Sequence, residues 1–213
     1  MRNILLATAG LCLMAGSAFA QMAAAPKDAT DITAADIQKV LKEGAKETDH
    51  NIKTVEMGQG YQMSIGVVFR GPTPAPGAPR PAGAAPTTAE CGLKALPAGA
   101  KQGPTGMLSH DSTPETYIIT QGSGTLVTGG DMLMGHRSAD DSSVVTTLNG
   151  PTCGGSVTGN FKSRDVAVGD IIIVPAGVPH GWASIPAGGV TYLSVRPDPK
   201  YVLPKNFVYP ALR

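Results

Sequence analysis

The sequence predicts an all-β protein, a sandwich or a barrel preceded by one short helix, and three observations support this. Its 213 residues include 27 glycines and 18 prolines but only 5% aromatic residues, which suits a turn-rich β protein better than a helical bundle. Short apolar runs of strand type recur from Ile52 onward, separated by Gly, Pro, Ser and Asp. About 190 residues follow the N-terminal segment, enough for one domain with a sizeable core.

The N-terminal segment has the pattern of a secretory signal peptide. Residues 1–20 have a basic residue at Arg2, continue with an apolar run over residues 4–14 and end in Ala-Phe-Ala before Gln21. An uncleaved membrane anchor is the weaker alternative, because the apolar run is short for a bilayer and no stop-transfer segment follows it. We therefore expect cleavage before Gln21 and a periplasmic or secreted protein.

The charge balance argues against large anionic partners. Without Arg2, the 17 basic residues become 16 and equal the 16 acidic ones, so the processed chain is formally neutral. A basic stripe for nucleic acid is missing, and so is a polybasic or amphipathic segment for a membrane surface. We expect neither a nucleic acid partner nor, after cleavage, a membrane partner.

Two cysteines remain after loss of the N-terminal segment, Cys91 and Cys153. In an oxidising compartment paired thiols normally oxidise, so a disulfide is expected. It would close a loop of about 60 residues, worth about 4 kcal/mol in the chain-entropy model. The spacing is not that of a redox motif, and we expect a structural link.

The chain divides into four predicted parts. A helix is expected after Thr33, where Ile37, Val40 and Leu41 fall at helical spacing and Asp36 can cap the first turn. Strands are expected at residues 51–57, 61–70, 115–121, 124–130, 170–177 and 190–197. The organisation is a signal peptide at 1–20, a lead-in and helix at 21–50, a β domain at 51–204 with a proline-rich loop at 71–86 and an insertion at 131–162, and a tail at 205–213.

A proline turn separates two side chains that can bind metal. His110 and Glu115 are five positions apart, so on one strand they would point to opposite faces. The sequence Ser-Thr-Pro at 112–114 favours a turn, so that His110 ends one strand and Glu115 begins a neighbouring one. Glu115, Tyr117 and Ile119 then share one face, and Gly122 closes the strand. The two ligand-type side chains are expected to reach one interior point.

A second motif lies at residues 169–182, GDIIIVPAGVPHGW, where glycines and proline form a turn and His180 opens the next strand. The spacing Gly169, Pro175, Gly177, His180 is similar to the second motif of the cupin superfamily. The stretch from His110 through Glu115 to Gly122 resembles the later part of the first cupin motif. The resemblance covers about residues 52–203.

The cupin resemblance implies a single antiparallel barrel of jelly-roll type, often dimeric, whose interior holds a divalent metal with His110, Glu115 and His180 as ligands. Chemically, two histidines and a carboxylate can bind Fe(II), Mn(II), Ni(II), Cu(II) or Zn(II). The family usually has another histidine where this chain has Leu108, and an asparagine where it has Ser184. The predicted site therefore has three protein ligands.

Several roles stay open at this stage. The three residues could instead form a metal-free hydrogen-bonded cluster that binds a small ligand, since buried polar groups need partners. Glu115 could act as a base with Tyr117 as proton donor, which makes both candidate catalytic residues. Trp182 could line the site or pack in the core, and the lone histidines at 50 and 136 are expected to be ordinary polar residues rather than ligands.

Two functions follow from these expectations. One is an exported metal-dependent enzyme, an oxygenase, lyase or isomerase of a small organic molecule. The other is a non-catalytic module that holds a small ligand or metal. The fold alone does not choose between them.

Overall fold

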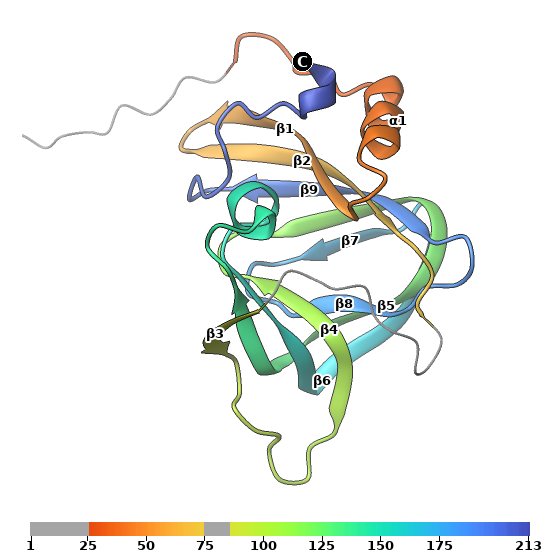
Figure 1. Cartoon of the computed structure of the whole chain (residues 1–213), viewed down its shortest axis with the longest axis vertical. Helices are drawn as coiled ribbons and strands as arrows, with labels where there is room; N and C mark the ends of the chain where they lie inside the picture. Colours follow the sequence, from red (N-terminus) through yellow and green to blue (C-terminus); the bar gives the residue numbers. More distant parts are fainter. Residues whose placement is uncertain (1–25, 75–85) are drawn as a thin grey trace, which may run out of the picture.

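A computed structural model describes residues 26–74 and 86–213 of the chain (Figure 1). The predicted signal peptide at 1–20 and most of the proline-rich loop at 71–86 lie outside these residues. None of the helices in the described part has the length and apolar character of a membrane span.

In the described residues, nine antiparallel strands form a barrel of two layers. The first layer joins β1, β2, β9, the start of β5 and β7, and the second joins the rest of β5 with β6, β4, β8 and β3. Because β8 pairs with both β4 and β5, the second layer closes on itself. The strands are β1 (Asp49–Gly58), β2 (Tyr61–Arg70), β3 (Pro86–Cys91), β4 (Gln102–His110), β5 (Glu115–Ser138), β6 (Thr152–Ala167), β7 (Ile171–Val174), β8 (His180–Ser184) and β9 (Val190–Asp198).

Strand β5 belongs to both layers, and it changes layer at Gly122. The strand pairs with β9 up to Gly122 and with β6 from Ser123 onward. Gly122 has a φ of 75°, and a Cβ at this position would collide with the carbonyl oxygen of Gly189. The prediction that Gly122 closes the strand was wrong: the strand bends there and continues to Ser138.

The segment expected as an insertion at 131–162 is largely sheet. The second half of β5 and the first half of β6 pair across it, from Asp131 with Thr158 to Arg137 with Cys153. A short π-helix, η1 (Val144–Leu148), connects the two strands. The Gly, Ser and Thr residues of segment 131–162 are typical of a loop. Strand β6 is nevertheless stable there, because it pairs with β5 on one side and with β4 on the other.

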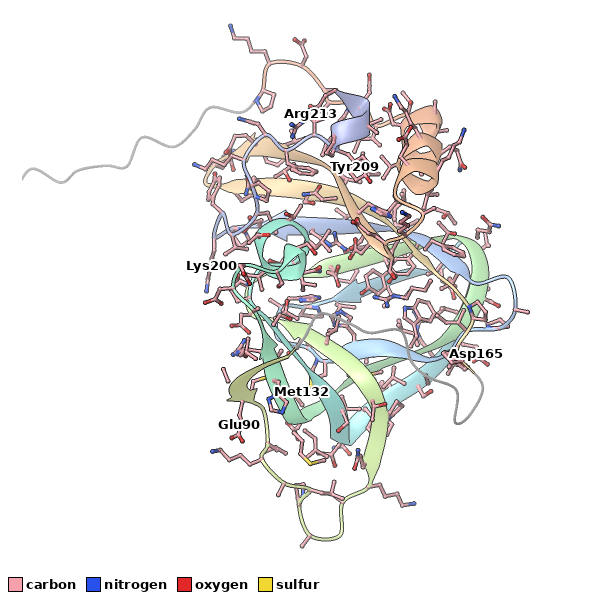
Figure 2. All side chains as sticks on the ribbon, viewed as in Figure 1. Glu90, Met132, Asp165, Lys200, Tyr209 and Arg213 are labelled. Carbon is pink, nitrogen blue, oxygen red and sulfur yellow. A yellow bond between two sulfur atoms is a disulfide. The ribbon has the colours of Figure 1, made fainter. Side chains whose placement is uncertain are left out.

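The predicted helix is confirmed as α1 (Ala34–Glu43). The hydroxyl of Thr33 accepts from the backbone N–H of Asp36 and the Asp36 carboxylate accepts from the N–H of Thr33, which completes a capping box. Val40 of α1 packs on Ile52 and Val67 of the first layer. The C-terminal segment ends in a 3₁₀ turn, η2 (Pro210–Leu212), and Figure 2 shows Tyr209 beside α1.

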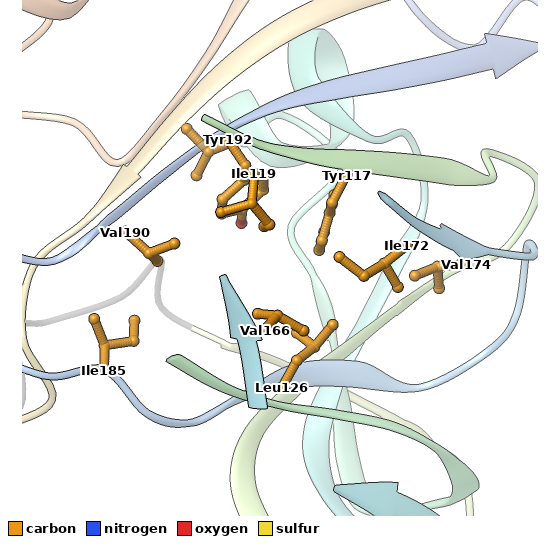
Figure 3. Packing of buried hydrophobic residues seen from close by; sticks show 10 residues of the cluster. Tyr117, Ile119, Leu126, Val166, Ile172, Val174, Ile185, Val190 and Tyr192 are labelled. Atoms are coloured by element: carbon orange, nitrogen blue, oxygen red, sulfur yellow. The ribbon is translucent and has the colours of Figure 1, made fainter. Parts of the chain in front are cut away.

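The main apolar core lies between the two layers. Tyr117, Ile119 and Tyr192 of the first layer face Leu126 and Val166 of the second, and all are at most 4% exposed (Figure 3). Burial of this kind supplies most of the stabilising free energy of a barrel. The predicted disulfide is present, joining Cys91 of β3 to Cys153 of β6.

Candidate metal centre

The predicted turn brings His110 and Glu115 together across the barrel. His110 is the last residue of β4 and Glu115 is the first of β5, as expected. The two strands are not paired neighbours, however, because β4 pairs in the second layer and the start of β5 in the first. The turn therefore carries the chain from one layer to the other, and both side chains point into the space between them.

His180 joins the pair from β8. It is the first residue of that strand, after a turn in which Gly177 has a φ of 78°. In the sheet His180 is paired with Leu108, the position at which the cupin motif usually has a histidine. Leu108, where the motif usually has a ligand, and the candidate ligand His180 therefore lie opposite each other on the paired strands β4 and β8.

The three side chains converge as the sequence predicts. Glu115 Oε2 lies 3.3 Å from His110 Nε2 and 3.1 Å from His180 Nε2. One ligand atom from each residue lies within 4.8 Å of the others, and none of the three residues is more than 4% exposed. Within the described residues this is the one such group of three or more.

The hydrogen bonds on the outer ring nitrogens fix which histidine atoms carry lone pairs. His180 Nδ1 lies 2.9 Å from the carbonyl oxygen of Val178, so this nitrogen must donate. The Thr152 hydroxyl donates to the Gly150 carbonyl at 2.8 Å and therefore accepts from His110 Nδ1 at 2.9 Å. In the neutral rings, the His180 Nε2 lone pair then faces Glu115 Oε2, and the His110 Nε2 lone pair accepts from Asn149 Nδ2 at 3.1 Å while lying 3.3 Å from Oε2.

The second oxygen of Glu115 is held by three donors. Oε1 accepts from Ser194 Oγ at 2.9 Å, Arg196 Nε at 2.8 Å and Asn149 Nδ2 at 3.0 Å. Arg196 is fully buried and also donates through Nη2 to Asp49 at 2.6 Å. These contacts fix the orientation of the carboxylate.

Electrostatics keep Glu115 charged and His110 neutral. Burial by itself raises the pKa of Glu115, but the positive charge of Arg196 holds that pKa well below its usual value. Burial lowers the pKa of His110, against the opposing effect of Glu115. An ionised carboxylate beside a neutral imidazole is the protonation state that a metal ion requires.

Tyr117 contacts the same group. Its hydroxyl donates to Glu115 Oε2 at 2.9 Å, and its ring lies edge-on to His180 at 6.0 Å. Burial, followed by the charge of Glu115, raises the pKa of Tyr117 well above its ordinary value, so the hydroxyl keeps its proton. The predicted position of Tyr117 on the face of Glu115 is confirmed.

The other aromatic and histidine candidates lie apart from this group. Trp182 packs against Tyr192 at 5.8 Å and belongs to the core. His50 is buried near α1, with its ring 5.7 Å from that of Tyr209. His136 is exposed on β5, paired with Glu90 of β3.

Sequence reasoning missed four contacting residues. Ser194 and Arg196 break the apolar pattern of β9 at period two, so their shared inward face could have been found from the alternation. Thr152 and Asn149 lie in a stretch rich in Gly, Ser and Thr, in which nothing in the pattern distinguishes them. Their role depends on the path of the β5–β6 connection.

Comparison with known proteins adds remote structural likenesses. No protein-family model and no curated protein sequence matches the chain. Among solved structures, peruvianin-I, a cysteine peptidase from Thevetia peruviana latex, is 12% identical with a TM-score of 0.31, over 79% of this chain and 76% of that one. An oxalate oxidase is 13% identical with a TM-score of 0.31, over 71% of this chain and 51% of that one. The hydroxypropylphosphonic acid epoxidase from S. wedmorenis is 13% identical with a TM-score of 0.27, over 67% of this chain and 48% of that one.

With TM-scores this low, the likenesses do not bear on activity, and the assignment depends on the chain's own features. Two motifs in the expected order place His110, Glu115 and His180 at one buried point of a closed antiparallel barrel. This is the arrangement that the cupin resemblance implies. The chain folds as a closed antiparallel β-barrel with a buried His-Glu-His group.

Proposed function

We propose that this protein binds one divalent transition metal ion through His110, Glu115 and His180. The observation that carries the proposal is the convergence of both Nε2 atoms and a carboxylate oxygen at one buried point, with both Nδ1 atoms donating elsewhere so that each Nε2 keeps its lone pair. His180 Nε2 and Glu115 Oε2 are both acceptors and lie 3.1 Å apart, and a cation between them removes their repulsion. A histidine that donates its outer N–H to an oxygen is also the usual arrangement of a metal ligand.

A metal-free cluster is the competing interpretation. It needs a second proton on at least one of the buried rings, so that the resulting imidazolium donates to Glu115. Burial lowers the pKa of His110 and so opposes this second proton at that ring. The donor set of two imidazoles and one carboxylate suits Fe(II), Mn(II), Ni(II), Cu(II) or Zn(II).

We further propose that the exported protein acts on a small organic molecule, by oxygenase, lyase or isomerase chemistry. A bound metal would supply Lewis acidity or, for iron, one-electron chemistry with dioxygen. Tyr117 holds a proton 2.9 Å from Glu115 Oε2, from where it can donate to a bound ligand. Arg196 keeps Glu115 ionised, and the surrounding layers exclude water.

Export is supported by two independent features. The first is the signal-peptide pattern of residues 1–20. The second is the disulfide between Cys91 and Cys153, which is typical of oxidising compartments. Fractionation of the native host, with the N-terminus of the protein sequenced, tests this; a cytoplasmic protein that starts at Met1 would contradict export.

Elemental analysis of the purified protein tests metal binding. We expect about one equivalent of a transition metal, lost in His110→Ala, His180→Ala and Glu115→Gln. His136→Ala is the matched control, because it removes an exposed histidine from the same barrel. Less than about a tenth of an equivalent in every preparation, including protein refolded with each metal, would refute the proposal.

A separate measurement distinguishes an enzyme from a binding module. Turnover of a panel of small carboxylic acids and carbonyl compounds, with dioxygen consumption recorded, should reveal activity in the metal-loaded protein. Tyr117→Phe should then lower kcat by about 10²-fold or more if the hydroxyl transfers a proton. Ligand binding without turnover would favour the non-catalytic module.

A further inference from the structure

Asn149 is a further buried polar residue at the candidate metal centre. It follows η1 in the β5–β6 connection and is 5% exposed. Its side-chain Nδ2 lies 3.0 Å from Glu115 Oε1 and 3.1 Å from His110 Nε2. The carboxamide thus touches two of the three candidate ligands.

Asn149 is held in this position by its own segment. Its backbone N–H donates to the Val144 carbonyl at 2.8 Å, which closes the π-turn. The buried Asn51 donates from Nδ2 to the Thr147 carbonyl at 3.1 Å and so attaches the segment to β1. The amide is therefore positioned by contacts that do not depend on a metal.

The chemistry of a carboxamide allows it to serve the site in two ways. Its N–H₂ donates, whereas its oxygen has the lone pairs of a metal ligand, and a half-turn about the Cβ–Cγ bond exchanges the two. Without a cation, Nδ2 donates to the Glu115 carboxylate and to the His110 lone pair. With a cation shared by these atoms, an inward N–H would be repelled and an inward oxygen would be attracted.

We propose that Asn149 Oδ1 is the fourth protein ligand of the metal, in place of the histidine that Leu108 does not provide. This inference rests on the proposed function. Carboxamide oxygens are ligands of hard divalent cations such as Mn(II), and an oxygen at the fourth position would favour these over thiophilic metals. The site then has two nitrogen and two oxygen donors.

The test compares Asn149→Ala with Ser194→Ala. Ser194 donates to the same Glu115 oxygen at 2.9 Å, so both variants remove one hydrogen bond to Oε1. The probe is Co(II), whose visible absorption reports ligand number, with the Kd measured by competition with a chelating dye. We expect Asn149→Ala to weaken Co(II) binding at least about tenfold more than Ser194→Ala does, and to change the visible spectrum that Ser194→Ala preserves.

Two further measurements keep the inference testable if Asn149→Ala does not fold. Asn149→Asp keeps a ligand oxygen, so it should bind Co(II) at least as tightly as the unaltered protein. In the unaltered protein, Zn(II) should shift the Asn149 side-chain N–H₂ signals in ¹⁵N NMR, identified by their absence from Asn149→Asp.

The outcomes separate the two proposals. If the unaltered protein binds Co(II) but Asn149→Ala matches Ser194→Ala in Kd and spectrum, Asn149 is only a hydrogen-bond donor and this inference is wrong. Unshifted Asn149 signals with bound Zn(II) would overturn it as well. If the unaltered protein binds neither metal, the proposed function fails, and the inference fails with it.

Discussion

Replacing Arg196 with methionine should destabilise the metal-free protein severely. The guanidinium is fully buried and donates to Glu115 Oε1 at 2.8 Å and to Asp49 Oδ2 at 2.6 Å. Methionine fills a similar volume without charge, so Arg196→Met leaves the Glu115 carboxylate buried without its cation. Asp49 is 16% exposed in its side chain and can be partly solvated.

The magnitude follows from the geometry. At an effective dielectric constant of about 20, unit charges about 3 Å apart attract by roughly 5–6 kcal/mol. The remaining donors to Glu115 recover part of this, and removal of one partner of a buried pair typically costs about 3–5 kcal/mol. Because domains are stable by only about 5–15 kcal/mol, the loss is a large fraction of the total.

Urea unfolding at pH 7, with a chelator present and the disulfide intact, measures the effect. Arg137→Met is the matched control, since Arg137 pairs with Asp111 at 2.6 Å but both side chains are more than a third exposed. That pair should contribute less than about 1 kcal/mol. Adding Glu115→Gln to Arg196→Met should restore part of the loss, because the uncompensated charge is then removed.

The pH dependence provides a second check. In the unaltered protein the pKa of Glu115 lies well below its unfolded value, so its contribution is present above about pH 4 and is lost as the pH falls through the folded pKa. Without Arg196, burial raises that pKa, and acid stabilises the variant relative to the unaltered protein. A loss below about 1 kcal/mol at pH 7, or one that grows as the pH falls from 7 to 4, would refute the reasoning.

Three other variants test the fold. Replacing Cys91 and Cys153 with serine should cost about 4 kcal/mol for a link across 62 residues, seen as a lower urea midpoint; an unchanged midpoint would contradict this. Ile52→Ala removes a fully buried side chain beneath α1 and should cost about 2–5 kcal/mol, with helical circular dichroism reporting whether α1 detaches. Gly122→Ala should lower the free energy of unfolding by more than about 1 kcal/mol, because residue 122 has a positive φ and its new Cβ would collide with the Gly189 carbonyl. An unchanged thermal unfolding midpoint would show that the bend of β5 at this residue can relax.

Local patterns predicted the parts of the fold that local physics controls. The helix with its cap at Thr33 and the strand at 61–70 follow from spacing and turn residues, and both are observed. Strand β6 was not foreseen because its Gly, Ser and Thr residues have no apolar alternation, and its pairing partners are far away in sequence. The prediction that a strand ends at Gly122 failed for a similar reason. A glycine can end a strand or bend it, and only pairing with β9 and β6 decides between these outcomes.

By itself, the sequence determined the three residues of the candidate centre, His110, Glu115 and His180, because ligand-type side chains beside Pro and Gly turns form a pattern along the chain. Only the tertiary structure decided what surrounds them. Thr152, which accepts from His110 Nδ1, and the carboxamide of Asn149 come from one other segment of the chain and the buried Arg196 from another, whereas Val178, which accepts from His180 Nδ1, lies two residues before it. The charge of Glu115, the tautomer of His110 and the place of a fourth ligand depend on distances across the barrel, which no spacing within one segment encodes.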